Sequence, residues 1–231
     1  MSGETGGDRR VAVVTGGAGA IGGAVAARLE PDHTVVVLDR VGDLGVDLDH
    51  PAGARRAAQV VLDRYGRCDV FVHAEAMTAF GPFDELHLEI WRQVQTVNVG
   101  SALLLAQAIS PRMRARGFGP VIFIVSDTYC RPPGAHILAH IASKGALVGM
   151  ACAPAVGLDG IEVTAVAPGP TRTPAIVNVP ADEFANTAAY RPVPRSLTPD
   201  ETAAAVAMLA GEDAAALTGE TLSLDSGLVL R

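Results

Sequence analysis

Short apolar runs alternate along the chain with longer stretches rich in alanine. The apolar runs favour β-branched residues and predict strands at residues 11–15, 34–38, 69–72, 121–125, 161–165 and 221–224. The alanine-rich stretches predict helices at residues 21–29, 52–65, 86–116, 139–156 and 200–209. Because the strand runs are apolar throughout rather than at alternate positions, both faces of each strand are expected to be buried. Helices linking such strands are typical of right-handed βαβ crossovers, so we predict an α/β fold with a doubly wound parallel sheet.

Two segments depart from this alternation. Residues 174–195 carry four prolines and no periodic pattern. An irregular loop of this length in a compact domain is more often a lid over a site than a connector, so we expect a substrate lid here. The stretch between the second strand and Asp47 is too short for a crossover helix, and we expect an abbreviated connection. Neither segment has the composition of a linker, so residues 1–231 are expected to form a single domain.

The composition narrows the classes of function. The 231 residues are 49% hydrophobic and carry a formal net charge of −7, which suits one domain with a full core and argues against nucleic acid or anionic membranes as partners. The apolar runs are far shorter than the roughly 20 residues of a membrane span, and the polar N-terminus lacks the apolar segment of a secretory signal. We therefore expect a soluble, cytoplasmic protein. Three widely spaced cysteines give no disulfide framework and no metal site.

A glycine-rich turn follows the first predicted strand and opens into the first predicted helix. It comprises Thr15, Gly16, Gly17, Ala18, Gly19, Ala20, Ile21 and Gly22. Its G-x-G-x-x-G pattern is typical of Rossmann-type sheets of about seven strands with helices on both faces, where glycines let the backbone approach a pyrophosphate. Asp39 lies about 20 residues further on, where a carboxylate accepts from ribose hydroxyls. Because Asp39 would repel a 2′-phosphate, we favour NAD over NADP, although the adjacent Arg40 could pair with one.

With these residues in place, the sequence resembles the short-chain dehydrogenase/reductase family over nearly its whole length. The glycine turn is similar to the family's T-G-x-x-x-G-x-G, with Ala20 at the middle glycine. Residues 72–76 depart from the family's N-N-A-G, whereas residues 97–100 and 224–227 match further family elements. The resemblance implies an adenine site and a nicotinamide site. Their residues would be Asp47 and Leu48 for the adenine, and Ala74, Pro168, Gly169, Thr171 and Thr173 toward the nicotinamide.

The family's chemistry uses a serine, a tyrosine and a lysine, assisted by an asparagine. The resemblance assigns Ser126 to the substrate oxygen, Lys144 to the nicotinamide ribose and Asn98 to a relay water. His140 stands four residues before Lys144, where the family's Y-x-x-x-K has its tyrosine. Positions four apart share a helix face, so both side chains are expected to enter one pocket. Lys144 is the only lysine among 18 basic residues, which suggests a position that arginine cannot fill.

Three interpretations of His140 stay open. Imidazole titrates near neutrality and could be the acid or base of an NAD(P)-dependent oxidoreductase acting on a carbonyl or alcohol. It could instead serve a non-redox lyase, isomerase or cyclase, or mark a catalytically degenerate dinucleotide-binding protein. Tyr129 and His136 could each supply a displaced acid, but we expect them to line the pocket. Glu75 is expected either to reach solvent, which we favour, or to contact a substrate cation. The resemblance also implies a small-molecule substrate and a homo-oligomer, either a dimer or a tetramer.

Overall fold

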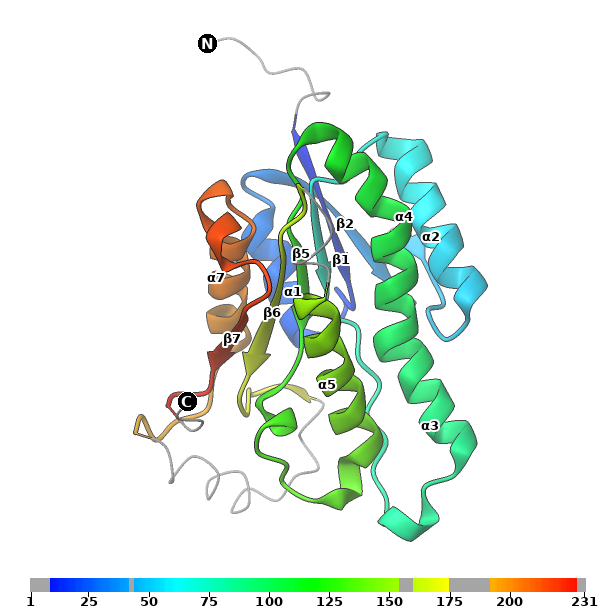
Figure 1. The fold of residues 1–231 in the computed structure, drawn as a ribbon, viewed down its shortest axis with the longest axis vertical. Coiled ribbons are helices and arrows are strands. Elements are labelled where there is room, and N and C mark those ends of the chain that lie inside the picture. The colour runs from blue at the N-terminus through cyan, green and yellow to red at the C-terminus, as the bar shows by residue number, and fades with distance from the viewer. Residues whose placement is uncertain (1–8, 42–43, 154–159, 175–191, 228–231) are drawn as a thin grey trace.

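A single parallel sheet forms the centre of the molecule, as seen in a computed structural model that describes residues 9–41, 44–153, 160–174 and 192–227 (Figure 1). Its seven strands lie in the order β3-β2-β1-β4-β5-β6-β7. The bounds are Arg10–Thr15 (β1), His33–Asp39 (β2), Leu44–Gly45 (β3), Val70–His73 (β4), Val121–Ile124 (β5), Val163–Pro168 (β6) and Thr221–Leu224 (β7). The strand order reverses direction between β1 and β4, which is where doubly wound folds bind ligands.

Helices cover both faces of the sheet (Figure 1). One face carries α1 (Ala20–Leu29) and α7 (Pro199–Leu209), and the other carries α2 (Pro51–Tyr65), α4 (Ser101–Arg116) and α5 (Leu138–Cys152). Helix α3 (Leu88–Gln95) runs into α4 through a π-helical turn, η2 (Thr96–Gly100). Short 3₁₀ turns complete the described elements. They are η1 (Phe83–Glu85), η3 (Asp127–Tyr129), η4 (Ala135–Ile137) and η7 (Glu212–Leu217).

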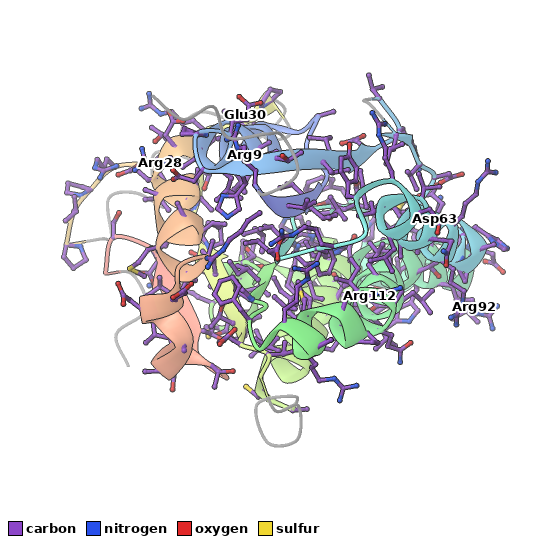
Figure 2. All side chains as sticks on the ribbon, turned by 90° about the horizontal axis from the view of Figure 1, so that it is seen from above. Arg9, Arg28, Glu30, Asp63, Arg92 and Arg112 are labelled. Atoms are coloured by element: carbon purple, nitrogen blue, oxygen red, sulfur yellow. The ribbon has the colours of Figure 1, made fainter. Side chains whose placement is uncertain are left out.

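Successive strand residues face opposite helical layers, which is why both faces need apolar side chains. Val13 of β1 packs with Leu105 of α4, whereas Val14 packs with Val25 of α1 and Val206 of α7. All five side chains are buried completely. Charged side chains such as those of Arg28, Asp63 and Arg92 lie at the periphery of these layers (Figure 2). The two apolar clusters together hold the sheet rigid beneath its carboxyl edge.

The predicted fold class is confirmed, and most predicted elements are found within a few residues of their expected positions. The connection after β2 is abbreviated as expected, because the two-residue β3 pairs with the end of β2. The helix predicted over residues 86–116 is instead divided by η2. Most of the predicted lid, residues 175–191, lies outside the described residues.

One helical segment meets the length and composition criteria of a membrane span, although its continuous apolar runs are short. Residues Ala135–Cys152 form a helical segment long and apolar enough to span a membrane by length and composition, with a mean hydropathy of 1.2. The same segment carries the buried side chains of Lys144 and Leu147, and α5 packs against β5 and β6. Its apolar character therefore comes from its place beside the sheet of a soluble Rossmann-like fold.

His73 ties the carboxyl ends of two strands to the π-helical turn. Its buried Nε2 lies 3.1 Å from the carbonyl oxygen of Asn98, which can only accept, so Nε2 carries the proton. Its Nδ1 then accepts from the Thr15 hydroxyl at 2.9 Å. The same hydroxyl oxygen accepts from the backbone N–H groups of Ala74 and Glu75, each at 3.1 Å. His73 thus links β1, β4 and η2 through one imidazole.

We predict that this imidazole makes the protein sensitive to acid. Burial, assisted by the nearby Lys144 charge, lowers the pKa of His73 to about 3. Below pH 6.5 the unfolded chain therefore binds a proton that the folded protein excludes, so stability falls as the pH drops from about 6.5 toward about 3. His73→Asn should reduce the slope of the unfolding free energy against pH by the contribution of one proton, which is at most about 1.4 kcal/mol per pH unit.

The measurement is the free energy of unfolding in urea at several pH values between 3 and 7. His87→Gln, a change at an exposed position, controls for the loss of an imidazole as such. Equal pH slopes for the wild type and His73→Asn would contradict the assignment.

Candidate active site

A cavity of about 350 Å³ lies at the carboxyl edge of the sheet, against the ends of β4, β5 and β6. It brings together three predicted catalytic residues, Ser126, His140 and Lys144. It is also lined by the predicted cofactor residues Ile21, Ala74, Pro168, Gly169, Thr171 and Thr173. Residues from five separate parts of the sequence therefore meet at one site.

Three glycines of the turn beside this cavity have no room for a side chain. Gly16 has a φ of +67°, and a Cβ atom there would lie 2.8 Å from the Cα of Glu75. A Cβ at Gly22 would lie 2.1 Å from the carbonyl oxygen of Gly16, and one at Gly17 would lie 2.6 Å from Val37 Cγ1. Helix α1 follows Gly19 without any side-chain cap on its first N–H groups. Glycines at a helix N-terminus let backbone N–H groups approach a phosphate closely, so this turn fits the pyrophosphate of a dinucleotide.

Asp39 and Arg40 have different environments at the end of β2. The Asp39 carboxylate accepts from the backbone N–H of Ala18 at 2.9 Å, so it lies directly beside the glycine turn. The Arg40 guanidinium forms an ion pair with Asp49 on the exposed surface. Asp47 accepts from the backbone N–H of Asp49 at 2.9 Å. Leu48 is buried in the core next to them, and neither Asp47 nor Leu48 lines the cavity.

Glu75 is half-buried rather than solvated as expected. Its backbone packs against Gly16, at the point where β4 ends. Burial and the Asp39 carboxylate raise the pKa of Glu75, while Arg40 opposes the shift. Two carboxyl groups therefore lie near the glycine turn, Asp39 at the end of β2 and Glu75 just after β4.

Lys144 is buried almost completely, with 3% of its surface exposed. Its Nζ donates to the carbonyl oxygen of Ile124 at 2.8 Å, which anchors the ammonium at the end of β5. Burial lowers the pKa of Lys144 to about 8, and Glu75 opposes the shift. At neutral pH the side chain remains cationic beneath the cavity.

His140 lies one helical turn before Lys144 on α5. Its Nδ1 is 3.1 Å from the hydroxyl oxygen of Thr78. Burial and then the Lys144 charge lower the pKa of His140 to about 4, while a hydrogen bond with the Met77 backbone opposes them. The imidazole is therefore neutral at physiological pH and can accept a proton.

Ser126 follows β5 and presents its hydroxyl at the cavity wall. Its Oγ accepts from the backbone N–H of Thr128 at 3.3 Å and from the Thr128 hydroxyl at 3.0 Å. Both contacts use lone pairs of Oγ, so the hydroxyl proton of Ser126 is left to donate to another oxygen.

Asn98 lies in η2 and is fully buried, outside the cavity wall. Its Oδ1 accepts from the Met77 N–H at 2.7 Å. Its Nδ2 donates to the Met77 carbonyl at 2.9 Å and to the Ser143 hydroxyl at 2.8 Å. The side chain thus bridges the segment after β4 and the helix that carries His140.

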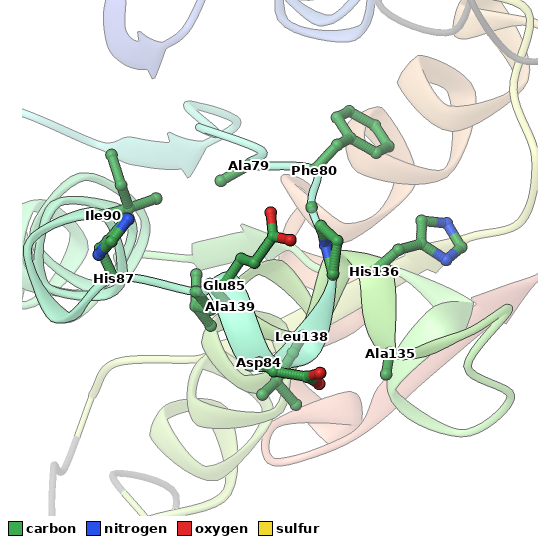
Figure 3. A pocket seen from close by; sticks show the side chains of 13 residues that line it. Ala79, Phe80, Asp84, Glu85, His87, Ile90, Ala135, His136, Leu138 and Ala139 are labelled. Carbon is green, nitrogen blue, oxygen red and sulfur yellow. The ribbon is translucent and has the colours of Figure 1, made fainter.

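A second cavity of about 660 Å³ adjoins the first, and Phe80 and His136 line both. Their rings are stacked with centroids 6.3 Å apart (Figure 3). Asp84 and Glu85 line only the larger cavity. Tyr129 packs against the α4 side of the core and does not line either cavity, unlike His136.

Thr78 and Ser143 contact His140, and the sequence patterns predicted neither contact. Thr78 belongs to an irregular segment without periodicity, and nothing in the sequence places it near His140. Ser143 directly precedes Lys144 and stands three residues after His140, so helix geometry places both on the same side of α5. Its residue type belongs to no motif that would have singled it out. Its partner is the backbone of His140 rather than the imidazole, since its hydroxyl donates to the His140 carbonyl at 2.7 Å.

Comparison with known proteins agrees with this geometry. The model of a family described as enoyl-(acyl carrier protein) reductase matches residues 20–229. The chain is 32% identical to cis-4-hydroxycyclohexanecarboxylate dehydrogenase from Sinomonas cyclohexanicum, covering 94% of this chain and 96% of the relative. It is 30% identical to acetoacetyl-CoA reductase from Acinetobacter, covering 96% and 99%.

Solved structures give the same result. A protein from Thermus thermophilus has a TM-score of 0.89 and 32% identity over 96% of this chain and 98% of its own. A variant of actinorhodin polyketide ketoreductase with NADPH has a TM-score of 0.86 and 29% identity over 97% and 99%. These matches span nearly the whole chain. The chain therefore belongs to the short-chain dehydrogenase/reductase family.

Proposed function

We propose that this protein is an NAD-preferring dehydrogenase that oxidises a small alcohol with an atypical Ser-His-Lys site. The observation that carries the proposal is the meeting of Ser126, His140 and Lys144 at one cavity, with His140 neutral and Lys144 cationic at pH 7. A neutral base and a nearby cation suit the removal of a proton from an alcohol.

Each of the three residues has a distinct task. Ser126 donates its hydroxyl proton to the substrate oxygen, which orients the alcohol toward α5. His140 accepts the hydroxyl proton as the carbon–oxygen bond becomes a carbonyl. The Lys144 ammonium, anchored on Ile124, would hold the nicotinamide ribose of a bound cofactor and stabilises negative charge on the reacting oxygen. Bound NAD would accept the hydride that the alcohol carbon releases.

The protonation states favour oxidation over reduction at neutral pH. Reduction of a ketone would require a protonated imidazole, and the lowered pKa of His140 keeps the ring neutral well below pH 7. The names of two relatives, cis-4-hydroxycyclohexanecarboxylate dehydrogenase and D-threitol dehydrogenase, support a small alcohol as the substrate class. Acetoacetyl-CoA reductase and the NADPH-bound ketoreductase are relatives named for the opposite direction.

The preference for NAD rests on charge at the end of β2. Asp39 lies beside the glycine turn, where its carboxylate can accept from ribose hydroxyls and repels a 2′-phosphate. Arg40 would favour a phosphate, but its guanidinium already pairs with Asp49. The half-buried Glu75 adds a second carboxyl group to the same region.

The first test removes the proposed base. His140→Gln should lower turnover of secondary alcohols with NAD about 100-fold or more, since a positioned base contributes that much. The assay follows nicotinamide absorbance with a panel of cyclic hydroxy acids and sugar alcohols. The affinity for NADH, measured by fluorescence, should change by less than about threefold. His87→Gln is the matched control, because that residue is exposed and lies outside the cavity of Ser126. Unchanged turnover in His140→Gln would exclude the imidazole as the base.

The second test is the pH dependence of kcat/KM for alcohol oxidation. The base form of His140 is present above about pH 4, and the cationic form of Lys144 is present below about pH 8. We expect a bell-shaped profile that rises through the first value and falls through the second. His140→Gln should lose the acidic limb while keeping the alkaline one. A wild-type profile that is flat across this range would contradict the assigned protonation states.

The third test concerns the cofactor. Asp39→Ser combined with Asp49→Asn removes two carboxylates, and loss of the Asp49 carboxylate releases Arg40 from its ion pair. The ratio of the NADPH to the NADH dissociation constant should fall by about tenfold or more, because one favourable charge interaction is worth about that factor. Asp63→Asn, an exposed change on α2, should leave the ratio unchanged. If the double variant keeps the wild-type ratio, these charges do not set the preference.

A further inference from the structure

We propose that Thr78 is a positioning residue that holds the Nδ1 edge of His140 and leaves Nε2 as the proton-accepting atom toward the substrate. This inference rests on the proposed role of His140 as the base. The Thr78 hydroxyl lies 3.1 Å from His140 Nδ1. Both residues line the cavity of Ser126 and Lys144. An imidazole has two nitrogens, so a partner on Nδ1 reserves Nε2 for the reacting oxygen.

The segment that carries Thr78 is fixed by its neighbour. Asn98 holds Met77 at two points, accepting from its N–H at 2.7 Å and donating to its carbonyl at 2.9 Å. Asn98 is itself fixed, because its backbone carbonyl accepts from the buried His73. Two bonds to one residue's backbone restrict both its translation and its rotation. The side chain that follows, that of Thr78, therefore has a defined origin despite lying in an irregular segment.

The same carboxamide also fixes the helix that carries His140. Asn98 Nδ2 donates to the Ser143 hydroxyl at 2.8 Å, and that hydroxyl donates to the His140 carbonyl at 2.7 Å. Asn98 thus connects to Thr78 through Met77 and to His140 through Ser143. Because both connections start from one buried side chain, the distance between the threonine hydroxyl and the imidazole is set by a closed set of hydrogen bonds.

The Met77 backbone raises the pKa of His140, opposing the effects of burial and of the Lys144 charge. The proposed arrangement places the ring proton of His140 on Nδ1, with the Thr78 hydroxyl oxygen 3.1 Å away as its acceptor. Nε2 then has a free lone pair, which a general base requires. A tyrosine needs no such partner, since its phenol has a single titrating atom.

The experiment compares Thr78→Val, which removes the hydroxyl at nearly constant shape, with Thr78→Ser, which keeps it. The tautomer of His140 is read from ¹⁵N chemical shifts of its imidazole at pH 7 in the full-length protein, with His140→Gln used to assign the signals. We expect the Nδ1–H form in the wild type and in Thr78→Ser, and a mixture of tautomers in Thr78→Val. Thr34→Val, at the amino end of β2, should behave as the wild type.

The kinetic arm uses alcohol oxidation with NAD. Thr78→Val should lower kcat about 10- to 100-fold, by analogy with the loss of partners that orient metal-bound histidines, with little change in KM for NAD. Thr78→Ser should recover most of this loss. An Nε2–H tautomer in the wild type, or an unchanged tautomer and kcat in Thr78→Val, would overturn the proposal. Because the tautomer is measured without turnover, it separates this failure from that of the proposed function, which His140→Gln tests directly.

Discussion

A connected set of buried hydrogen bonds at the carboxyl edge of the sheet controls the rest of the site. It begins at the Thr15 hydroxyl, passes through the His73 imidazole to Asn98, and divides there toward Met77 and Ser143. Each of these polar groups would destabilise the fold if it were left without a partner, by about 1–3 kcal/mol. The apolar layers on both faces position the strands, but this set of bonds decides where the irregular segment after β4 and the first turns of α5 lie relative to each other.

Much of the fold could be predicted because its cause is local. Strands buried on both faces need continuous apolar runs, and the glycine turn needs residues that leave room for backbone contacts, so both appear in the sequence. The division of residues 86–116 by a π-helical turn was not predictable, since apolar periodicity is the same on either side of it. The turn matters because it carries Asn98, whose buried side chain hydrogen-bonds Met77 and Ser143.

The candidate site was predictable only where a motif fixes the spacing. Four residues on a helix bring His140 and Lys144 to one cavity, and that distance follows from helix geometry alone. The partner of Arg40 did not follow from the sequence, because Asp49 reaches it only through the abbreviated connection after β2. Glu75 was expected to reach solvent, yet the close packing of its backbone on Gly16 leaves it half-buried. In both cases the folded path of the chain, rather than the residue type, determines the electrostatic environment of the side chain.

The environment of Lys144 explains why a chain that otherwise uses arginine keeps one lysine. Its ammonium is buried, and among the described residues Ile124 supplies its one protein acceptor. A guanidinium at the same place would bring five N–H donors into a site with that single backbone acceptor, and each unpaired donor would carry a desolvation cost. Arginine also stays charged at any pH compatible with folding, whereas burial lowers the pKa of Lys144 to about 8. A lysine can therefore be buried beside a neutral imidazole and still titrate within reach of neutral pH, which links the composition of the chain to the chemistry of its cavity.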